Sequence, residues 1–110
     1  LKLDNLIVFV DYPKTEFEVA IEKLPKVDKI QDKFEAFSWK VLQVTGAHNY
    51  DQLFEAIIKA HATIRKPVCV WAHTVAGKGI GFAEMKRGYI NTVLSDGELS
   101  HILPKFKQLI

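Results

Sequence analysis

The chain has 110 residues, a formal net charge of +2, and 48% hydrophobic and 25% charged residues. This length allows one domain at most, and the composition is typical of a soluble globular protein. Basic and acidic residues are interspersed, which argues against a nucleic-acid-binding stripe, and no apolar run approaches the ~20 residues of a membrane helix. The single cysteine, Cys69, excludes an internal disulfide and indicates a reducing, cytoplasmic compartment.

The first predicted element is a strand over Leu6–Val10, LIVFV. A continuous apolar run of this kind is typical of a parallel strand that is covered on both faces. Asp11 is expected to end the strand, because Pro13 lacks the amide that a further strand residue would donate. The strand begins only a few residues into the sequence, so we expect an upstream segment to be missing. Lys14–Lys26 has no clean period and is interpreted as irregular.

Two helices and a second strand are predicted next. Apolar residues at roughly helical spacing predict a short helix over Asp28–Phe37, and alternation predicts a strand over Trp39–Val44. The strongest helix is Asn49–Ile64, where Asn49 and Gln52 fit a capping box. We expect one apolar stripe of this helix to face the sheet, with a histidine packed on it: Leu53, Phe54, Ile57, Ile58, His61 and Ile64.

The sequence from Pro67 to Phe82, PVCVWAHTVAGKGIGF, joins a buried strand over Val68–Trp71 to a glycine-rich loop. Three glycines in Gly77–Gly81 free the backbone to take positive φ and to approach a ligand closely. Open α/β sheets bind ligands at loops of this kind, beyond the carboxyl ends of parallel strands. The spacing fits neither a dinucleotide fingerprint nor a P-loop, so a mobile connection in which Lys78 is merely solvated stays open.

A last helix is predicted from the capping box of Ser95 and Glu98, with Leu99, Ile102 and Leu103 facing inward and Pro104 breaking it. Strands and helices therefore alternate along the chain, which predicts parallel strands with right-handed crossovers. The expected fold class is a three-layer α/β/α arrangement with a parallel sheet. Three strands are few for a sheet whose central strands are fully covered, so we expect a missing half or an obligatory partner.

Several phrases resemble the thiamine-diphosphate-binding domain of transketolase, especially the form encoded as a separate N-terminal section. They run in order over nearly the whole chain: LDNLIVFVD, FEAFSWKVLQVTG, LFEAI, KPVCVWAHTVAGKGIGFAE and SDGEL. The resemblance implies that residues 1–110 form a single, partial domain of the thiamine-diphosphate-binding fold. Deoxyxylulose-phosphate synthase is a related alternative, because its glycine loop is similar.

The resemblance also implies a cofactor, thiamine diphosphate, held between two subunits through Mg²⁺. One family metal ligand would lie upstream of Leu1, and Pro13 stands where the second, an asparagine, is expected. Proline has no side-chain oxygen, so we expect no metal ligand here. In the same comparison Tyr89 matches a tryptophan and Ile90 a catalytic histidine, so no catalytic residue is assigned. The candidate cofactor-binding residues are His73 and Thr74 at the strand end and Gly77, Lys78 and Gly79 in the loop.

The sequence is compatible with three functions. In the first, the chain is part of an enzyme that transfers two-carbon ketol units between sugar phosphates. The chain would be inactive alone and completed by a missing N-terminal half or second subunit in a homo- or hetero-oligomer. Alternatively, it is a catalytically degenerate relative that acts as an assembly or regulatory partner. The third possibility is a binding module for a phosphorylated small molecule at the glycine loop.

Overall fold

The computed structural model describes residues 3–15 and 29–107. Three parallel strands form one sheet: β1 (Ile7–Lys14), β2 (Lys40–Val44) and β3 (Val68–Val75). Their order is β1-β3-β2, so the strand that carries the VCVW run lies at the centre of the sheet. Most of the segment interpreted as irregular lies outside the described residues.

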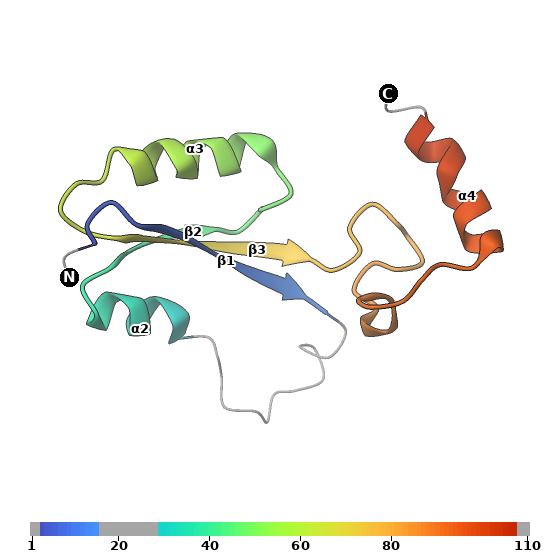
Figure 1. The fold of residues 1–110 in the computed structure, drawn as a ribbon, viewed down its shortest axis with the longest axis horizontal. Helices are drawn as coiled ribbons and strands as arrows, with labels where there is room; N and C mark the ends of the chain where they lie inside the picture. The colour runs from blue at the N-terminus through green and yellow to red at the C-terminus, as the bar shows by residue number, and fades with distance from the viewer. Residues whose placement is uncertain (1–2, 16–28, 108–110) are drawn as a thin grey trace.

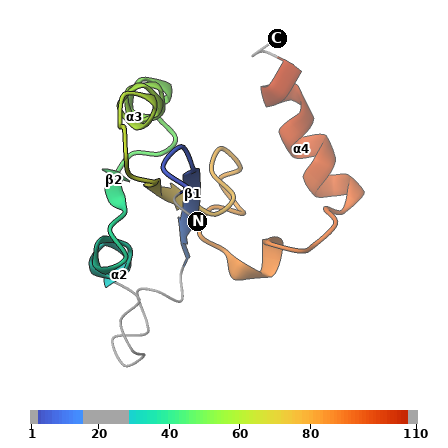
Figure 2. The ribbon, with the colours of Figure 1, turned by 60° about the vertical axis from the view of Figure 1, so that its left-hand side comes forward.

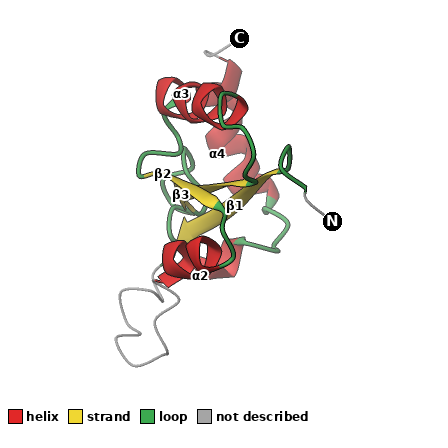
Figure 3. Ribbon diagram, turned by 90° about the vertical axis from the view of Figure 1, so that its left-hand side faces the viewer, coloured by secondary structure: helices red, strands yellow, loops and turns green. Residues whose placement is uncertain are grey.

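Two helices cover opposite faces of this sheet, α2 (Ile30–Ala36) and α3 (Tyr50–His61) (Figures 1 and 3). The chain crosses the sheet from β1 to β2 and returns to β3, and right-handed crossovers in opposite directions put their helices on opposite faces. The predicted three-layer α/β/α fold class and both predicted helices are therefore confirmed. None of the described helices is long and apolar enough to cross a membrane.

The core lies between the sheet and α3. Val68, Val70 and Ala72 point to this face of β3, and Ala56 and Ala60 of α3 pack against them. Small side chains on the helix let its backbone approach the sheet closely. The other face of β3 carries Cys69 and Trp71, which are also buried, because successive strand residues alternate between faces.

The prediction that one apolar stripe of α3 is buried is wrong for all of its residues except Leu53. Leu53 packs against the core, but Phe54 is 65% exposed, and Ile57, Ile58, His61 and Ile64 are exposed as well. The helix has two adjoining apolar stripes, and the alanine stripe is the one that faces the sheet. The helix also ends at His61, three residues earlier than predicted.

Of the two interactions in the predicted capping box of α3, the one made by the Asn49 side chain is present. The Asn49 side-chain oxygen accepts hydrogen bonds from the amides of Asp51 (2.9 Å) and Gln52 (3.2 Å). The Gln52 side chain accepts from the Gly46 amide at 3.0 Å, in the turn before the helix, rather than from Asn49. The cap therefore ties the β2–α3 turn to the helix.

The expected end of β1 at Asp11 is wrong, because the strand continues through Pro13 to Lys14. The carbonyls of Leu6 and Lys14 accept from amides of the β3 chain, so even-numbered residues of β1 direct their backbone groups to β3. Pro13, an odd-numbered residue, turns its amide position to the outer edge, where none is needed. β1 is an edge strand, and Phe9 on it is 50% exposed, so the expected cover on both faces is not found in the described residues.

The last helix, α4 (Asp96–Lys107), lies beyond the carboxyl ends of the strands (Figures 1 and 2). Its predicted capping box is confirmed: the Ser95 amide donates to Glu98 (2.9 Å) and the Glu98 amide to Ser95 (3.4 Å). Ile102 is buried, whereas Leu99 and Leu103 are exposed. The expected break at Pro104 is wrong, because α4 continues through this residue to Lys107.

Candidate functional site

The carboxyl ends of the three strands meet at one edge of the sheet, because all three run parallel (Figure 1). The end of β1 contributes Asp11 and Pro13, and the turn after β2 contributes His48. The end of β3 contributes His73 and Thr74, and the glycine-rich loop follows directly. This edge is where an open α/β sheet places a ligand.

On the α3 side of this edge, hydrogen bonds hold the strand ends together. The Thr74 hydroxyl donates to the Asp11 carboxylate at 2.6 Å. The Val75 amide donates to His48 Nε2 at 2.7 Å, so this ring nitrogen carries no proton. His48 therefore ties the turn after β2, just before the N-cap of α3, to the end of β3.

On the α2 side, His73 forms a polar and aromatic cluster. Its Nε2 lies 2.9 Å from the side-chain nitrogen of Gln43, and its ring contacts those of Trp71 and Tyr12, with centroids 4.4 and 5.6 Å away. Trp71 Nε1 is buried and has no hydrogen-bond partner among the described residues. His73 and the neighbouring Thr74 thus point to opposite faces of the sheet, and each is already engaged by another strand.

The loop after β3 is a closed structure built on two left-handed glycines. Gly77 has φ +71° and Gly79 φ +94°. A Cβ at Gly77 would lie 2.4 Å from the carbonyl oxygen of Ala83, so only glycine fits there. The Met85 amide donates to the Ala76 carbonyl at 2.7 Å and closes the base of the loop.

Glu84 contacts both the backbone and the lysine of this loop. The sequence did not predict this role, because only the short separation of Glu84 from Lys78 along the chain indicates a contact. Its carboxylate accepts from the Gly79 amide at 3.0 Å and lies 3.4 Å from Lys78 Nζ. The hydrogen bond from Gly79, followed by that from Lys78, lowers the pKa of Glu84 below its ordinary value. Lys78 is therefore held by an ion pair at the loop tip, which is more order than a solvated lysine on a mobile connection would show.

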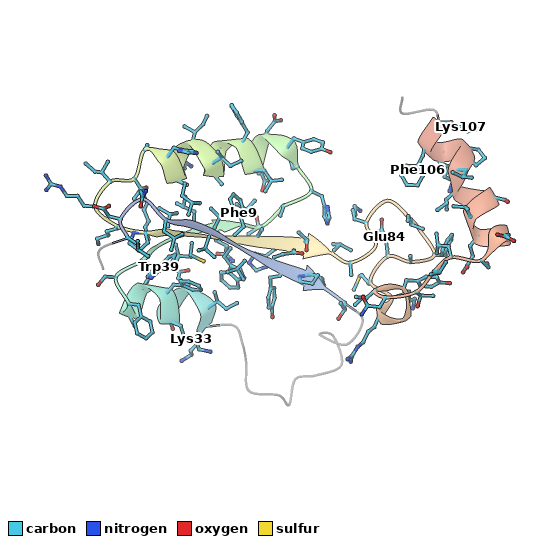
Figure 4. The ribbon with its side chains drawn as sticks, viewed as in Figure 1. Phe9, Lys33, Trp39, Glu84, Phe106 and Lys107 are labelled. Atoms are coloured by element: carbon cyan, nitrogen blue, oxygen red, sulfur yellow. The ribbon has the colours of Figure 1, made fainter. Side chains whose placement is uncertain are left out.

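Ile90, which the sequence resemblance aligns with a catalytic histidine, follows a short 3₁₀ helix, η2 (Arg87–Tyr89). Ile90 and Gly77 line the same cavity of about 240 Å³, so the structure brings the two predicted positions together. The Tyr89 hydroxyl donates to Glu98 at 2.6 Å, which anchors η2 to α4. Figure 4 shows Glu84 inside the neighbouring loop, between the strand ends and α4.

Glu98 is held ionised by the same contacts. Hydrogen bonds from Ser95, and then from Tyr89, lower the pKa of Glu98 to about 2. The pKa of Tyr89 is raised in return, because its hydroxyl donates to that carboxylate. The network therefore serves to join η2 and α4 at neutral pH.

The comparisons with known proteins place this arrangement in a family. The sequence matches the family model described as "Transketolase, thiamine diphosphate binding domain" over residues 1–106. The chain belongs to this family. It is 33% identical over 95 residues to the 6-deoxy-6-sulfo-D-fructose transketolase subunit SqwG of Clostridium sp. (strain MSTE9), covering 86% of this chain. It is 29% identical over 83 residues to one subunit of the apulose-4-phosphate transketolase of Phocaeicola vulgatus, covering 76% of this chain.

The transketolase-type chain spans only part of these relatives. It covers 34% of the SqwG polypeptide and 29% of the apulose-4-phosphate transketolase polypeptide. Against transketolase 1 of Pasteurella multocida, which is 32% identical over 79 residues, it covers 12% of the length. All three relatives carry the transketolase name, which favours that family over the deoxyxylulose-phosphate synthase alternative.

The residues at the strand ends do not fit a magnesium site. Asp11 offers one carboxylate, which already accepts from Thr74, and Pro13 offers no side-chain oxygen. Across residues 3–15 and 29–107, no group of three His, Cys, Asp or Glu side chains is arranged to hold a metal ion.

Proposed function

We propose that this chain is part of a thiamine-diphosphate-dependent enzyme that transfers a two-carbon ketol unit between sugar phosphates. The observation that carries the proposal is the family match over residues 1–106, together with an ordered glycine loop at the strand ends. Thiamine diphosphate, when bound, would supply the carbanion that accepts the ketol unit. The chain alone is proposed to be inactive, and a missing N-terminal half or a second subunit would supply the metal ligands.

The glycine loop is the proposed contribution of this chain to the shared site. Gly77 and Gly79 let the backbone come close to a bound ligand, and Lys78 would pair with a phosphate group of the cofactor or sugar. Lys78 is half-exposed, so it can exchange Glu84 for a phosphate without leaving the loop. His73 and Thr74 are proposed to keep the end of β3 in position beneath the ligand.

The test is a ketol-transfer assay on the complex of this chain with its partner polypeptide. The substrates should include 6-deoxy-6-sulfo-D-fructose and apulose 4-phosphate, which the names of the relatives mention. Lys78→Ala is expected to raise KM for phosphorylated substrates roughly tenfold, as loss of a charge-assisted contact does. Lys59→Ala, which removes an exposed ion pair on α3, is the matched control and should change nothing. An assembled complex without any ketol transfer would refute the proposal.

A second candidate function is an assembly or regulatory role without catalysis. Pro13 and Ile90 favour it, because neither side chain can ligate a metal or move a proton. Calorimetric titration of the chain alone with thiamine diphosphate and Mg²⁺ is expected to show no micromolar binding. Micromolar, Mg²⁺-dependent binding would contradict that expectation. Titration of the assembled complex then separates the two candidates, since only the enzyme requires binding there.

A further inference from the structure

The amide of Gly79 differs from neighbouring amides of the glycine loop in the group that accepts its hydrogen bond. The amides of Lys78, Ile80 and Ala83 donate to nearby backbone carbonyls, so the course of the chain itself satisfies them. The Gly79 amide donates instead to the Glu84 carboxylate, at 3.0 Å. Its hydrogen bond therefore depends on a side chain, which can turn away without a change in the backbone.

Two donors converge on this carboxylate. The Lys78 ammonium nitrogen lies 3.4 Å from the same Glu84 oxygen that accepts from the Gly79 amide. A backbone amide and an ammonium group placed side by side are donors that proteins use to hold phosphate oxygens. Glu84 lies inside the loop (Figure 4), so the anion that the two donors hold in this structure is supplied by the chain itself.

The two donors can be reached from solvent. The Lys78 side chain is 50% exposed and that of Glu84 33%. A Cβ at Gly79 would meet no atom within 4 Å, so there is room beside the backbone there, whereas the same position at Gly77 is filled by the Ala83 carbonyl. Exposed ion pairs are weak, so a ligand that carries more charge can displace this carboxylate.

We propose that the Gly79 amide and the Lys78 ammonium group form a subsite for a phosphoryl group, and that the Glu84 carboxylate is its internal competitor. Glu84 fills the subsite in the free chain and leaves when phosphoryl oxygens take its two donors. A phosphoryl group suits the subsite because it carries nearly two negative charges and three acceptor oxygens. The inference rests on the proposed function in that Lys78 pairs with phosphate there. It adds that the chain's own carboxylate lowers the affinity for every anionic ligand.

A purely structural role for the contact predicts different behaviour. If Glu84 only fastened the loop, an anion would not compete with it, and loss of its charge would loosen the loop without raising the affinity for phosphate. Competition predicts the reverse. Glu84→Gln removes the charge that holds Lys78, while the new side-chain amide oxygen can still accept from the Gly79 amide.

Titration of the full chain with methyl phosphate, followed at the Gly79 amide by nuclear magnetic resonance at constant ionic strength, measures the affinity of the subsite. Glu84→Gln is expected to raise this affinity roughly fivefold, the factor by which an exposed ion pair competes. Glu55→Gln removes the same charge from the exposed Glu55–Lys59 pair on α3 and, as the matched control, should leave the affinity unchanged. Lys78→Ala should abolish the response. Equal affinities in the two glutamine variants, a response that survives Lys78→Ala, or no response at all would overturn the proposal.

The titration of Glu84 tests the competition without any substitution. The hydrogen bond from Gly79, then that from Lys78, lower the pKa of Glu84 below 4.5, with a smaller electrostatic contribution from His48. A ligand that takes both donors should therefore return this pKa toward 4.5. Sulfate is the suitable probe, because it keeps its two charges in the acidic range where a carboxyl group titrates, and chloride at equal ionic strength is the control. A Glu84 pKa that is the same in sulfate and in chloride would contradict the competition.

Two sources of the phosphoryl group are separated by a parallel titration with methyl diphosphate. Methyl phosphate represents a sugar phosphate, and methyl diphosphate represents the phosphorylated end of the cofactor. The tighter of the two identifies the group that the loop holds, and binding of either supports the subsite. Neither assay uses ketol transfer. A chain that fails both assays while the assembled enzyme transfers ketol units would refute this inference and leave the proposed function standing.

Discussion

Gly77→Ala should destabilise the glycine loop more than the same substitution at Gly79 or Gly81. Gly77 has φ +71°, a conformation that costs an L-residue roughly 1–2 kcal/mol. The new Cβ would also lie 2.4 Å from the oxygen and 2.7 Å from the carbon of the Ala83 carbonyl. That backbone must move by about 1 Å to restore ordinary contact, and overpacking of this kind costs about 1–3 kcal/mol. The expected total is roughly 2–5 kcal/mol.

Two other glycines in the loop separate these contributions. Gly79 has φ +94° and open space around its Cβ position, so Gly79→Ala should cost only the backbone strain, about 1–2 kcal/mol. Gly81 has ordinary φ and open space, so Gly81→Ala should be neutral or slightly stabilising, by about 0.4–1 kcal/mol. The series therefore ranks Gly77 above Gly79 and Gly79 above Gly81.

Native-state hydrogen exchange is the suitable assay, because the loop can open without the sheet unfolding. The amide of Met85, which closes the loop on Ala76, reports its opening. Gly77→Ala should raise the exchange rate of this amide by at least about thirtyfold, the factor that 2 kcal/mol produces. Exchange rates that agree between Gly77→Ala and Gly81→Ala would refute the loop geometry.

Three further predictions concern stability. Val70 is fully buried, so Val70→Ala should lower the free energy of unfolding by about 2 kcal/mol. Phe54 is exposed, so Phe54→Ala should change this free energy by less than about 1 kcal/mol. Urea melts of the chain measure both. Asn49→Ala removes the cap of α3 and should cost about 1 kcal/mol, and Asn49→Asp should retain most of the stability; equal melts for the two would contradict the cap. The pKa of Glu98 is lowered from 4.5 to about 2, so its stabilisation of α4 is complete above pH 4.5 and is lost as the pH falls through 2. Glu98→Gln should flatten this acid dependence, measured as amide exchange at the start of α4.

The features that can be predicted well from the sequence are local ones. Asn49 and Ser95 mark helix starts because their side chains bond amides two or three residues away, so no other part of the chain has to be known. The central strand is recognisable because VCVW is apolar on both faces, and β3 is indeed covered on both. Helix caps and apolar runs can therefore be predicted from a single sequence.

The wrong predictions depend on partners distant in sequence. Pro13 by itself indicates the end of a strand, and only the register of β1 on β3 shows that its amide position faces outward. In α3, the stripes through Ala56 and through Phe54 are both apolar, and periodicity does not tell which of them meets the sheet. The contact between Glu84 and Gly79 depends on the loop closing on itself, which spacing alone does not encode.

The errors at β1 and α3 have a common physical origin. LIVFV predicts a strand with both faces covered, and the second α3 stripe predicts a buried helix face, yet Phe9 and Phe54 are exposed in this chain. Both residues lie at the same edge of the sheet and on the same face. Among the described residues, the outer edge of β1 is unpaired and two aromatic rings are exposed beside it. Such a surface is unfavourable in water, because the apolar area stays hydrated and the backbone groups can pair with any other strand. Both expectations are met at once if one further strand and one further helix cover this edge. The sequence pattern then describes a sheet wider than the three strands that the described residues form.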